Sequence, residues 1–168
     1  MTNPMIQIQV RDYGTMTAEL FPEKAPVTVE NFLKLIEEGF FNGLIFHRVI
    51  EGFMIQGGGY DEQMEHKDTD SIVGEFTQNG CTTNDLKHER GVLSMARTSD
   101  PNSASSQFFI MHRNAPHLDN QYAGFGILTD GFDVLDAIAA VPTGMYGWYM
   151  QDVPRTPVVI ESISVVSR

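Results

Sequence analysis

Apolar and polar residues alternate at the start of the chain, in Ile6–Val10 and again in Thr15–Leu20, with turn-forming residues between the two runs. A period of two is typical of a strand with one buried face, so the two runs predict a β-hairpin. Six further short apolar runs, bounded by turn-forming clusters, predict more strands at Leu44–Val49, Phe53–Gln56, Gly91–Met95, Gln107–Met111, Phe125–Leu128 and Val158–Val165.

Two segments have the spacing of amphipathic helices instead. The first opens at Ala25-Pro26 and ends before Gly39, with apolar residues at i, i+3, i+4 and i+7: Val29, Phe32, Leu33 and Ile36. The second spans roughly Asp133–Ala140. Many strands with only two helices do not give the regular alternation of a doubly wound sheet, and they favour a mainly β fold that closes into a barrel.

Residues 60–83 are polar, acidic and poorly periodic. This composition predicts a long surface loop, with one short strand around Ile72–Phe76. Near the C-terminal end, Trp148 lies in an aromatic run. We expect its indole ring to pack against the second helix, with contact to a partner as the alternative.

The overall composition limits the class of protein. A chain of 168 residues is the size of one domain, which we place at residues 1–168. The 22 acidic and 11 basic residues give a net charge of −11, which disfavours nucleic acid and anionic membranes as partners. Cys81 stands alone, so it forms no internal disulfide or multi-thiolate zinc site. The sequence has no export-like start, and we expect a cytoplasmic protein.

The segment 46–58 concentrates polar and apolar side chains on two strand-like runs. Period two puts Phe46 and Arg48 on one face, and Met54 and Gln56 on one face of the next run. If these faces coincide, a cation, an amide and apolar surfaces converge. The run 106–111 likewise puts Gln107, Phe109 and Met111 on one face, and Phe108 and Ile110 on the core side.

Other chemistries find little support. The run Gly57–Gly59 has no lysine or helix after it, as a phosphate-binding loop would, and a turn or bulge explains it better. No serine lies in a nucleophile elbow. The histidines lack ligand spacing, and His47 is expected to point away from Arg48 in a structural role. An arginine in a strand is, taken alone, usually a solvated surface residue.

Four motifs together resemble the cyclophilin family. Residues 46–58, FHRVIEGFMIQGG, are similar to the family signature FHRxIxGFMxQGG; GVLSMA at 91–96, SQFFI at 106–110 and FG at 125–126 match three of its strands. The resemblance runs from the first hairpin to Val165. It implies a closed eight-stranded antiparallel β-barrel capped by two α-helices, with the active site on the outer surface of the barrel.

The resemblance also implies a peptidyl-prolyl cis/trans isomerase with no metal, cofactor or covalent step. Arg48 would be the catalytic cation and Gln56 its positioning partner. The residues implied in peptide binding are Phe53, Met54, Phe109 and Leu118 around the proline, and Ala96, the backbone of Arg97, Thr98 and Gln107 beside it. Proline-containing peptides and folding proteins are the implied partners of a monomer. Binding of proline segments without turnover is the alternative.

The chain departs from many eukaryotic cyclophilins at the rim of the implied site. It has His117 where they have tryptophan, Tyr122 where they have histidine, Arg97 where they have asparagine, and Glu51 where the signature has proline. The first two substitutions resemble bacterial cytoplasmic members. The loss of the indole donor implies that cyclosporin binds with reduced affinity.

Overall fold

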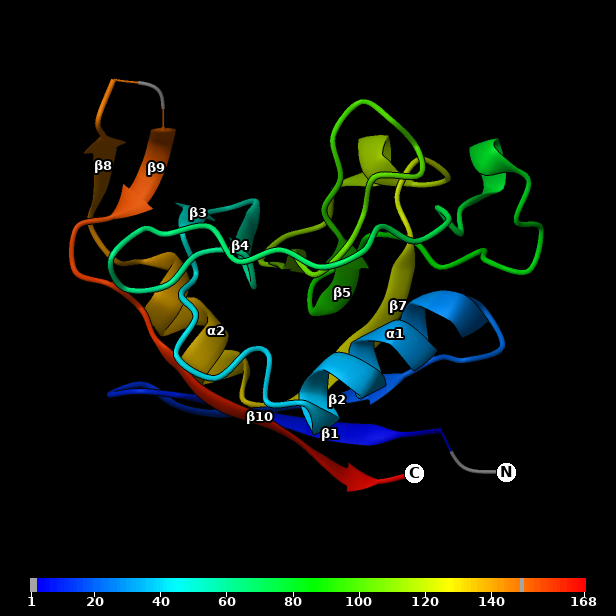
Figure 1. The fold of residues 1–168 in the computed structure, drawn as a ribbon, viewed down its shortest axis with the longest axis horizontal. Coiled ribbons are helices and arrows are strands. Elements are labelled where there is room, and N and C mark those ends of the chain that lie inside the picture. Colours follow the sequence, from blue (N-terminus) through cyan, green and yellow to red (C-terminus); the bar gives the residue numbers. More distant parts are fainter. Residues whose placement is uncertain (1–2, 149) are drawn as a thin grey trace.

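The computed structural model describes residues 3–148 and 150–168 (Figure 1). It contains ten strands, two α-helices and two short 3-10 helices. In chain order these are β1 (Met5–Val10), β2 (Gly14–Leu20), α1 (Pro26–Glu37), β3 (Arg48–Ile50), β4 (Met54–Gly57), η1 (Thr77–Asn79), β5 (Val92–Met95), β6 (Phe108–Met111), η2 (Pro116–Leu118), β7 (Gly124–Asp130), α2 (Phe132–Ala139), β8 (Thr143–Tyr146), β9 (Met150–Pro154) and β10 (Ile160–Ser167). The mainly β class with two helices is confirmed.

Eight strands form one antiparallel sheet in the order β10-β1-β2-β7-β5-β6-β4-β3. The expectation of a closed barrel is wrong, because the sheet is an open half-barrel with β10 and β3 as its edges. Residues 43–46 meet residues 158–160 through a few backbone hydrogen bonds and one isolated bridge, Ile45↔Val159, and no ladder forms there. Only the last two residues of the predicted strand Leu44–Val49 lie in β3, which continues to Ile50.

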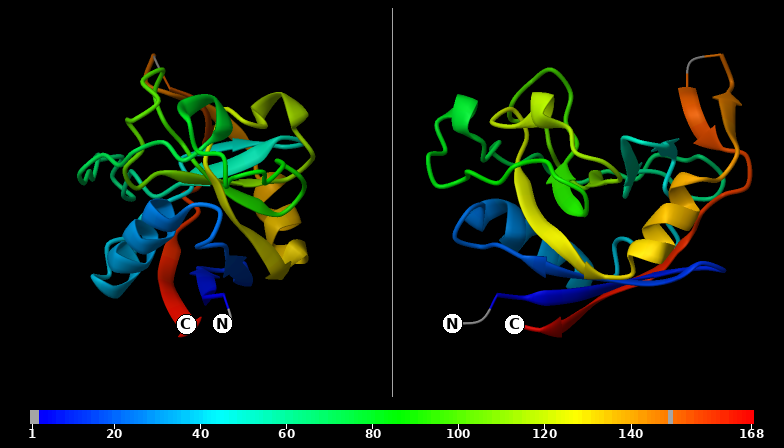
Figure 2. Two further views of the ribbon diagram at one scale, coloured as in Figure 1. Left: turned by 90° about the vertical axis from the view of Figure 1, so that its right-hand side faces the viewer. Right: turned by 180° about the vertical axis from the view of Figure 1, so that it is seen from behind.

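The two helices cover the two ends of the curved sheet (Figures 1 and 2), and the buried residues of both belong to the same core on its inner side. The main core includes Phe32 of α1, whose ring centroid lies 4.9 Å from that of Phe125 on β7 and 5.2 Å from that of Phe108 on β6. All three rings are fully buried. Aromatic pairs at these separations add to the stability that burial alone provides, so α1 and the inner face of the sheet hold each other in place.

The long segment between β4 and β5 is a loop, but it contains no strand at Ile72–Phe76, which corrects that prediction. The buried carboxylate of Glu75 instead accepts hydrogen bonds from the backbone N–H groups of Val27, at 3.2 Å, and Thr28, at 2.6 Å. These are orphan donors in the first turn of α1. The loop thus caps the helix, and its polar groups find partners without a β ladder.

A separate hairpin of β8 and β9 was not predicted from the sequence. Its turn contains Gly147 at a positive φ of 63°, a conformation that glycine adopts without strain. The side chain of Trp148 is 87% exposed at this turn. The expected packing of Trp148 against the second helix is therefore wrong.

Candidate active site

A small apolar cluster lies on the outer face of the sheet, apart from the main core. Side chains alternate along β6, so Phe108 and Ile110 point into the core while Phe109 and Met111 point outward, as predicted. Met54 of β4 joins the outward pair and is only 1% exposed. The outer face is therefore apolar enough to bind an apolar ligand and to shield it from water.

Strand register brings the predicted cation beside this cluster. Arg48 of β3 pairs with Gln56 of β4, and Gln56 pairs with Phe109 of β6. Nη1 of Arg48 donates to Oε1 of Gln56 at 3.2 Å, and Nε2 of Gln56 donates to Oε1 of Gln107 at 3.0 Å. A Cβ on Gly59 would lie 2.5 Å from the Gln107 side chain, so this glycine leaves room for the chain of amides.

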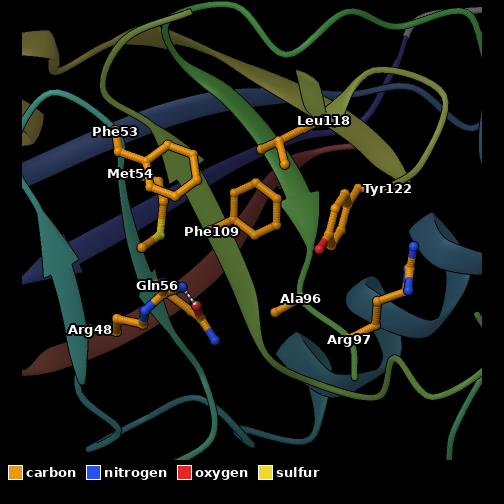
Figure 3. A pocket seen from close by; sticks show the side chains of 9 residues that line it. All are labelled: Arg48, Phe53, Met54, Gln56, Ala96, Arg97, Phe109, Leu118 and Tyr122. Atoms are coloured by element: carbon orange, nitrogen blue, oxygen red, sulfur yellow. Dashed lines mark hydrogen bonds between the residues drawn. The ribbon is translucent and has the colours of Figure 1, made fainter. Parts of the chain in front are cut away.

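The apolar cluster and the cation border one cavity of about 190 Å³ (Figure 3). Figure 3 shows Arg48 and Gln56 on one side of it and Tyr122 and Arg97 on the other. Nine residues line the cavity: Arg48, Phe53, Met54, Gln56, Ala96, Arg97, Phe109, Leu118 and Tyr122. All nine were predicted site residues, although they come from six separate parts of the chain.

A second hollow of about 150 Å³ adjoins the first and shares Gln56, Ala96 and Arg97 with it. Its lining is mostly polar. The remaining residues around it are Thr98, Ser103, Ser105 and Gln107. Two predicted site residues, Thr98 and Gln107, therefore line this hollow and not the apolar cavity.

Arg97 contributes its side chain as well as the backbone that the sequence predicted. Its guanidinium carbon lies 4.8 Å from the ring centroid of Phe76 and 4.6 Å from that of Tyr122. Nη2 donates to the carbonyl oxygen of Gln121 at 2.6 Å, and Nη1 donates to that of Thr98 at 2.9 Å. Arg97 thereby ties the Tyr122 wall of the cavity to the loop that carries Phe76.

His117 lies at the edge of the site. Its ring stacks on Phe53, with centroids 5.9 Å apart and an angle of 29° between the planes. The imidazole is exposed, and it lines neither of the two hollows. It is the one predicted site residue that stands outside both.

The sequence reasoning missed a buried polar group behind the cavity floor. The ring of His88 stacks on Phe109 at 6.0 Å, with Nε2 2.8 Å from Oγ of Ser94 and Nδ1 3.2 Å from Oδ1 of Asp119. Burial lowers the pKa of His88, although Asp119 opposes this by favouring the charged form. No spacing in the sequence connects these residues, because only the fold brings them together.

Phe46, which was predicted to share a face with Arg48, lies in the main core with its ring centroid 6.1 Å from that of Phe108, so that prediction is wrong; the residues before β3 do not form a regular strand, and their side chains do not alternate. His47 lies between Phe46 and Arg48. It is 5% exposed, and its ring packs against Tyr60 at 4.6 Å. Burial, followed by the positive charge of Arg48, lowers the pKa of His47 from 6.5 to about 4. Nδ1 of His47 has no hydrogen-bond partner within the described part of the chain. His47 is therefore neutral at pH 7.

Neither a metal site nor a membrane span is evident in residues 3–148 and 150–168. These residues contain no group of three or more His, Cys, Asp and Glu side chains that could hold a metal ion. None of the helices found in the same ranges has the length and apolarity needed to cross a membrane. The cytoplasmic location stays a prediction.

The curved antiparallel sheet with two helices, and the arginine beside an apolar cavity on its outer face, agree with the cyclophilin resemblance of the sequence motifs. Residues 5–165 match the family described as cyclophilin type peptidyl-prolyl cis-trans isomerase/CLD. This chain belongs to the cyclophilin family, and it is an enzyme of the peptidyl-prolyl cis/trans isomerase class.

Relatives and solved structures are similar over almost the whole chain. The peptidyl-prolyl cis-trans isomerase B of Escherichia coli K12 is 44% identical over 92% of this chain and 95% of the relative. A peptidyl-prolyl cis-trans isomerase of Acinetobacter baylyi is 43% identical over 99% of this chain and 88% of its own. A cyclophilin type isomerase of Cryptosporidium parvum superposes with a TM-score of 0.81, at 30% identity and 99% coverage of both chains.

Proposed function

We propose that Arg48 accelerates X-Pro isomerisation by hydrogen bonding to the prolyl nitrogen in the transition state. Rotation about the peptide bond meets a barrier of about 18–20 kcal/mol because it removes amide resonance. In the twisted state the nitrogen regains a lone pair, which the flat ground states lack. A donor aimed at this lone pair lowers the barrier because it binds the transition state more tightly than either isomer.

The observation that carries this proposal is the position of Arg48 at the wall of an apolar cavity. The floor of that cavity is made by Met54 and Phe109, which are 1% and 5% exposed. The pyrrolidine ring would enter it and displace water from around the guanidinium. A hydrogen bond is stronger in such a surrounding than in bulk water. The Cryptosporidium parvum relative, also solved in the presence of the dipeptide Ala-Pro, supports proline as the occupant.

Gln56 acts as a positioning residue in this mechanism. It holds Nη1 of Arg48 and is itself held by Gln107. A guanidinium fixed in this way loses less entropy on reaching the transition state than a mobile one does. Thr98 and Gln107, around the polar hollow, would contact the peptide beside the proline.

The proposed substrates are proline-containing peptides and unfolded or folding proteins, and we further propose that the protein acts as a monomer. Exchange NMR or a protease-coupled assay on a proline-containing tetrapeptide tests the proposal. Faster cis/trans exchange with catalytic amounts of protein is the expected result. Saturable binding of the peptide without faster exchange would show a proline-binding module and would refute the proposed catalysis.

A further inference from the structure

The hairpin of β8 and β9 carries an apolar tip, which consists of Met145, Tyr146 and Trp148. These side chains are 57%, 41% and 87% exposed. Three other large apolar side chains in the described chain have comparable exposure, and all three are valines, at positions 27, 73 and 166. Large aromatic and methionine side chains are enriched where proteins bind other chains. The concentration of Met145, Tyr146 and Trp148 at one end of the hairpin therefore marks a candidate binding surface.

The base of the hairpin holds this tip in a defined place. Thr143 pairs with Pro154, and Gly144 pairs with Val153. Val153 and Pro154, both on β9, are buried. The backbone N–H of Arg155 donates to the carbonyl oxygen of Pro142 at 2.9 Å, which closes the base further. The tip is thus presented by a paired β structure.

The hairpin continues the candidate active site beyond its Arg48 side. Strand β9 contacts β3, the strand on which Arg48 lies. Figures 1 and 2 show the hairpin rising on the same side of the sheet as η2, which carries Leu118 of the cavity. A peptide chain that leaves the cavity over β3 therefore moves toward the hairpin.

The chemistry of the hairpin suits an uncharged apolar ligand. Between Val141 and Pro154 the only charged residue is Asp152, although the whole protein has a net charge of −11. A surface hollow of about 370 Å³ lies against the hairpin, but its lining is mixed, since the charged Arg155 borders it together with Gly144, Met145, Tyr146, Val153 and Pro154. The apolar character therefore belongs to the exposed tip and not to this hollow. Methionine adapts its shape to irregular apolar partners. Residues 141–154 contain no lysine or arginine that could bind a polyanion.

We propose that the apolar tip binds apolar side chains of an unfolded client protein, some residues away from the proline in the cavity. This inference rests on the proposed function of the Arg48 site. The two contacts would act on one chain, so that binding at the tip raises the local concentration of prolines at the cavity. A tetrapeptide is too short to use both contacts, whereas an unfolded protein can do so.

Trp148 provides a direct probe, because it is the only tryptophan of the chain. Its emission is measured while the protein is titrated with a reduced and alkylated, tryptophan-free protein that stays unfolded. We expect a saturable blue shift, since burial moves indole emission to shorter wavelength. A proline-containing tetrapeptide should occupy the cavity without this shift. Unchanged emission at saturating unfolded protein would overturn the proposal.

The kinetic test compares two double variants. Met145→Ser with Trp148→Ser removes the tip, and Val73→Ser with Val166→Ser is the control, because these valines are 50% and 56% exposed elsewhere. On proline-limited refolding of a protein, we expect the tip variant to lose about three- to tenfold in kcat/KM, through KM. Its activity on the tetrapeptide should stay within about twofold, and the control should resemble the wild type on both substrates.

The remaining outcomes separate the alternatives. Equal losses on both substrates would mean that the hairpin supports β3 and does not bind clients, and full refolding activity of the tip variant would also overturn the proposal. Sedimentation that shows a dimer abolished by the tip variant would assign the surface to a second copy of the chain instead. If the wild type isomerises neither substrate, the proposed function fails, and the fluorescence titration still decides whether the tip binds unfolded protein.

Discussion

Gln56→Leu removes the acceptor of Arg48 while keeping a side chain of similar size on β4. A hydrogen bond to a charged group contributes about 1.5–3 kcal/mol. Arg48 is half-buried, so water replaces part of the lost bond, and we expect a cost of about 1–2 kcal/mol. This cost corresponds to about a 5- to 30-fold loss in kcat/KM, expressed mainly in kcat because the cavity stays intact. Gln107→Leu removes only the outer bond of the chain and should cost less.

The assay is a double-mutant cycle on a tetrapeptide substrate, with kcat and KM measured separately for each variant. If Gln56 acts by positioning the guanidinium, its replacement should have almost no effect in an Arg48→Ala background. The same fold-loss in both backgrounds would mean that Gln56 acts independently of Arg48. Circular dichroism and the unfolding midpoint of each variant establish that the fold is retained.

Three further predictions concern groups outside the cavity. Because the folded-state pKa of His47 is about 4, below its ordinary 6.5, the unfolded chain takes up this proton first as the pH falls. The stabilisation that neutral His47 gives to the folded state is complete above about pH 6.5 and is lost toward pH 4, and at pH 5 the free energy of unfolding is lower by roughly 2 kcal/mol. The free energy of unfolding in urea should therefore depend less on pH in His47→Phe than in the wild type. The same pH dependence in both proteins would refute the assignment. Cys81→Ser and dialysis against EDTA should both leave kcat/KM unaltered, since rotation about an amide needs no nucleophile or metal; a loss with the fold intact would contradict this. His117→Trp should strengthen cyclosporin inhibition about tenfold or more without changing kcat/KM, and equal inhibition of both forms would remove His117 from the ligand rim.

The local pattern of the sequence was sufficient for most strands and both helices. Alternation correctly separated Phe108, which fills the core, from Phe109, which lines the cavity. The reason is that the pleat of a strand fixes the direction of each side chain. The family motifs then supplied the residues around the cavity, since Arg48, Gln56 and Phe109 become neighbours only through strand register.

The features that were missed depend on contacts between distant segments. Whether the sheet closes is decided where residues 43–46 meet residues 158–160, and no local pattern reports the few hydrogen bonds formed there. The position of His88 behind Phe109 likewise requires that β5, β6 and the residue Asp119 already be in place. The hairpin at 143–154 was hidden because its glycines and exposed aromatic residues do not alternate as a half-buried strand does.

The most direct test of the proposed mechanism is kcat/KM of Arg48→Ala on a proline-containing tetrapeptide, measured beside Arg48→Lys. The arginine is half-buried on the outer face of the sheet, so both variants should keep the fold. We expect the alanine variant to lose about a hundred- to a thousandfold, as enzymes do when a donor to the transition state is removed. The lysine variant should also be poor, because an ammonium group cannot reproduce the planar guanidinium held by Gln56. A correctly folded Arg48→Ala protein with activity near that of the wild type would contradict the account.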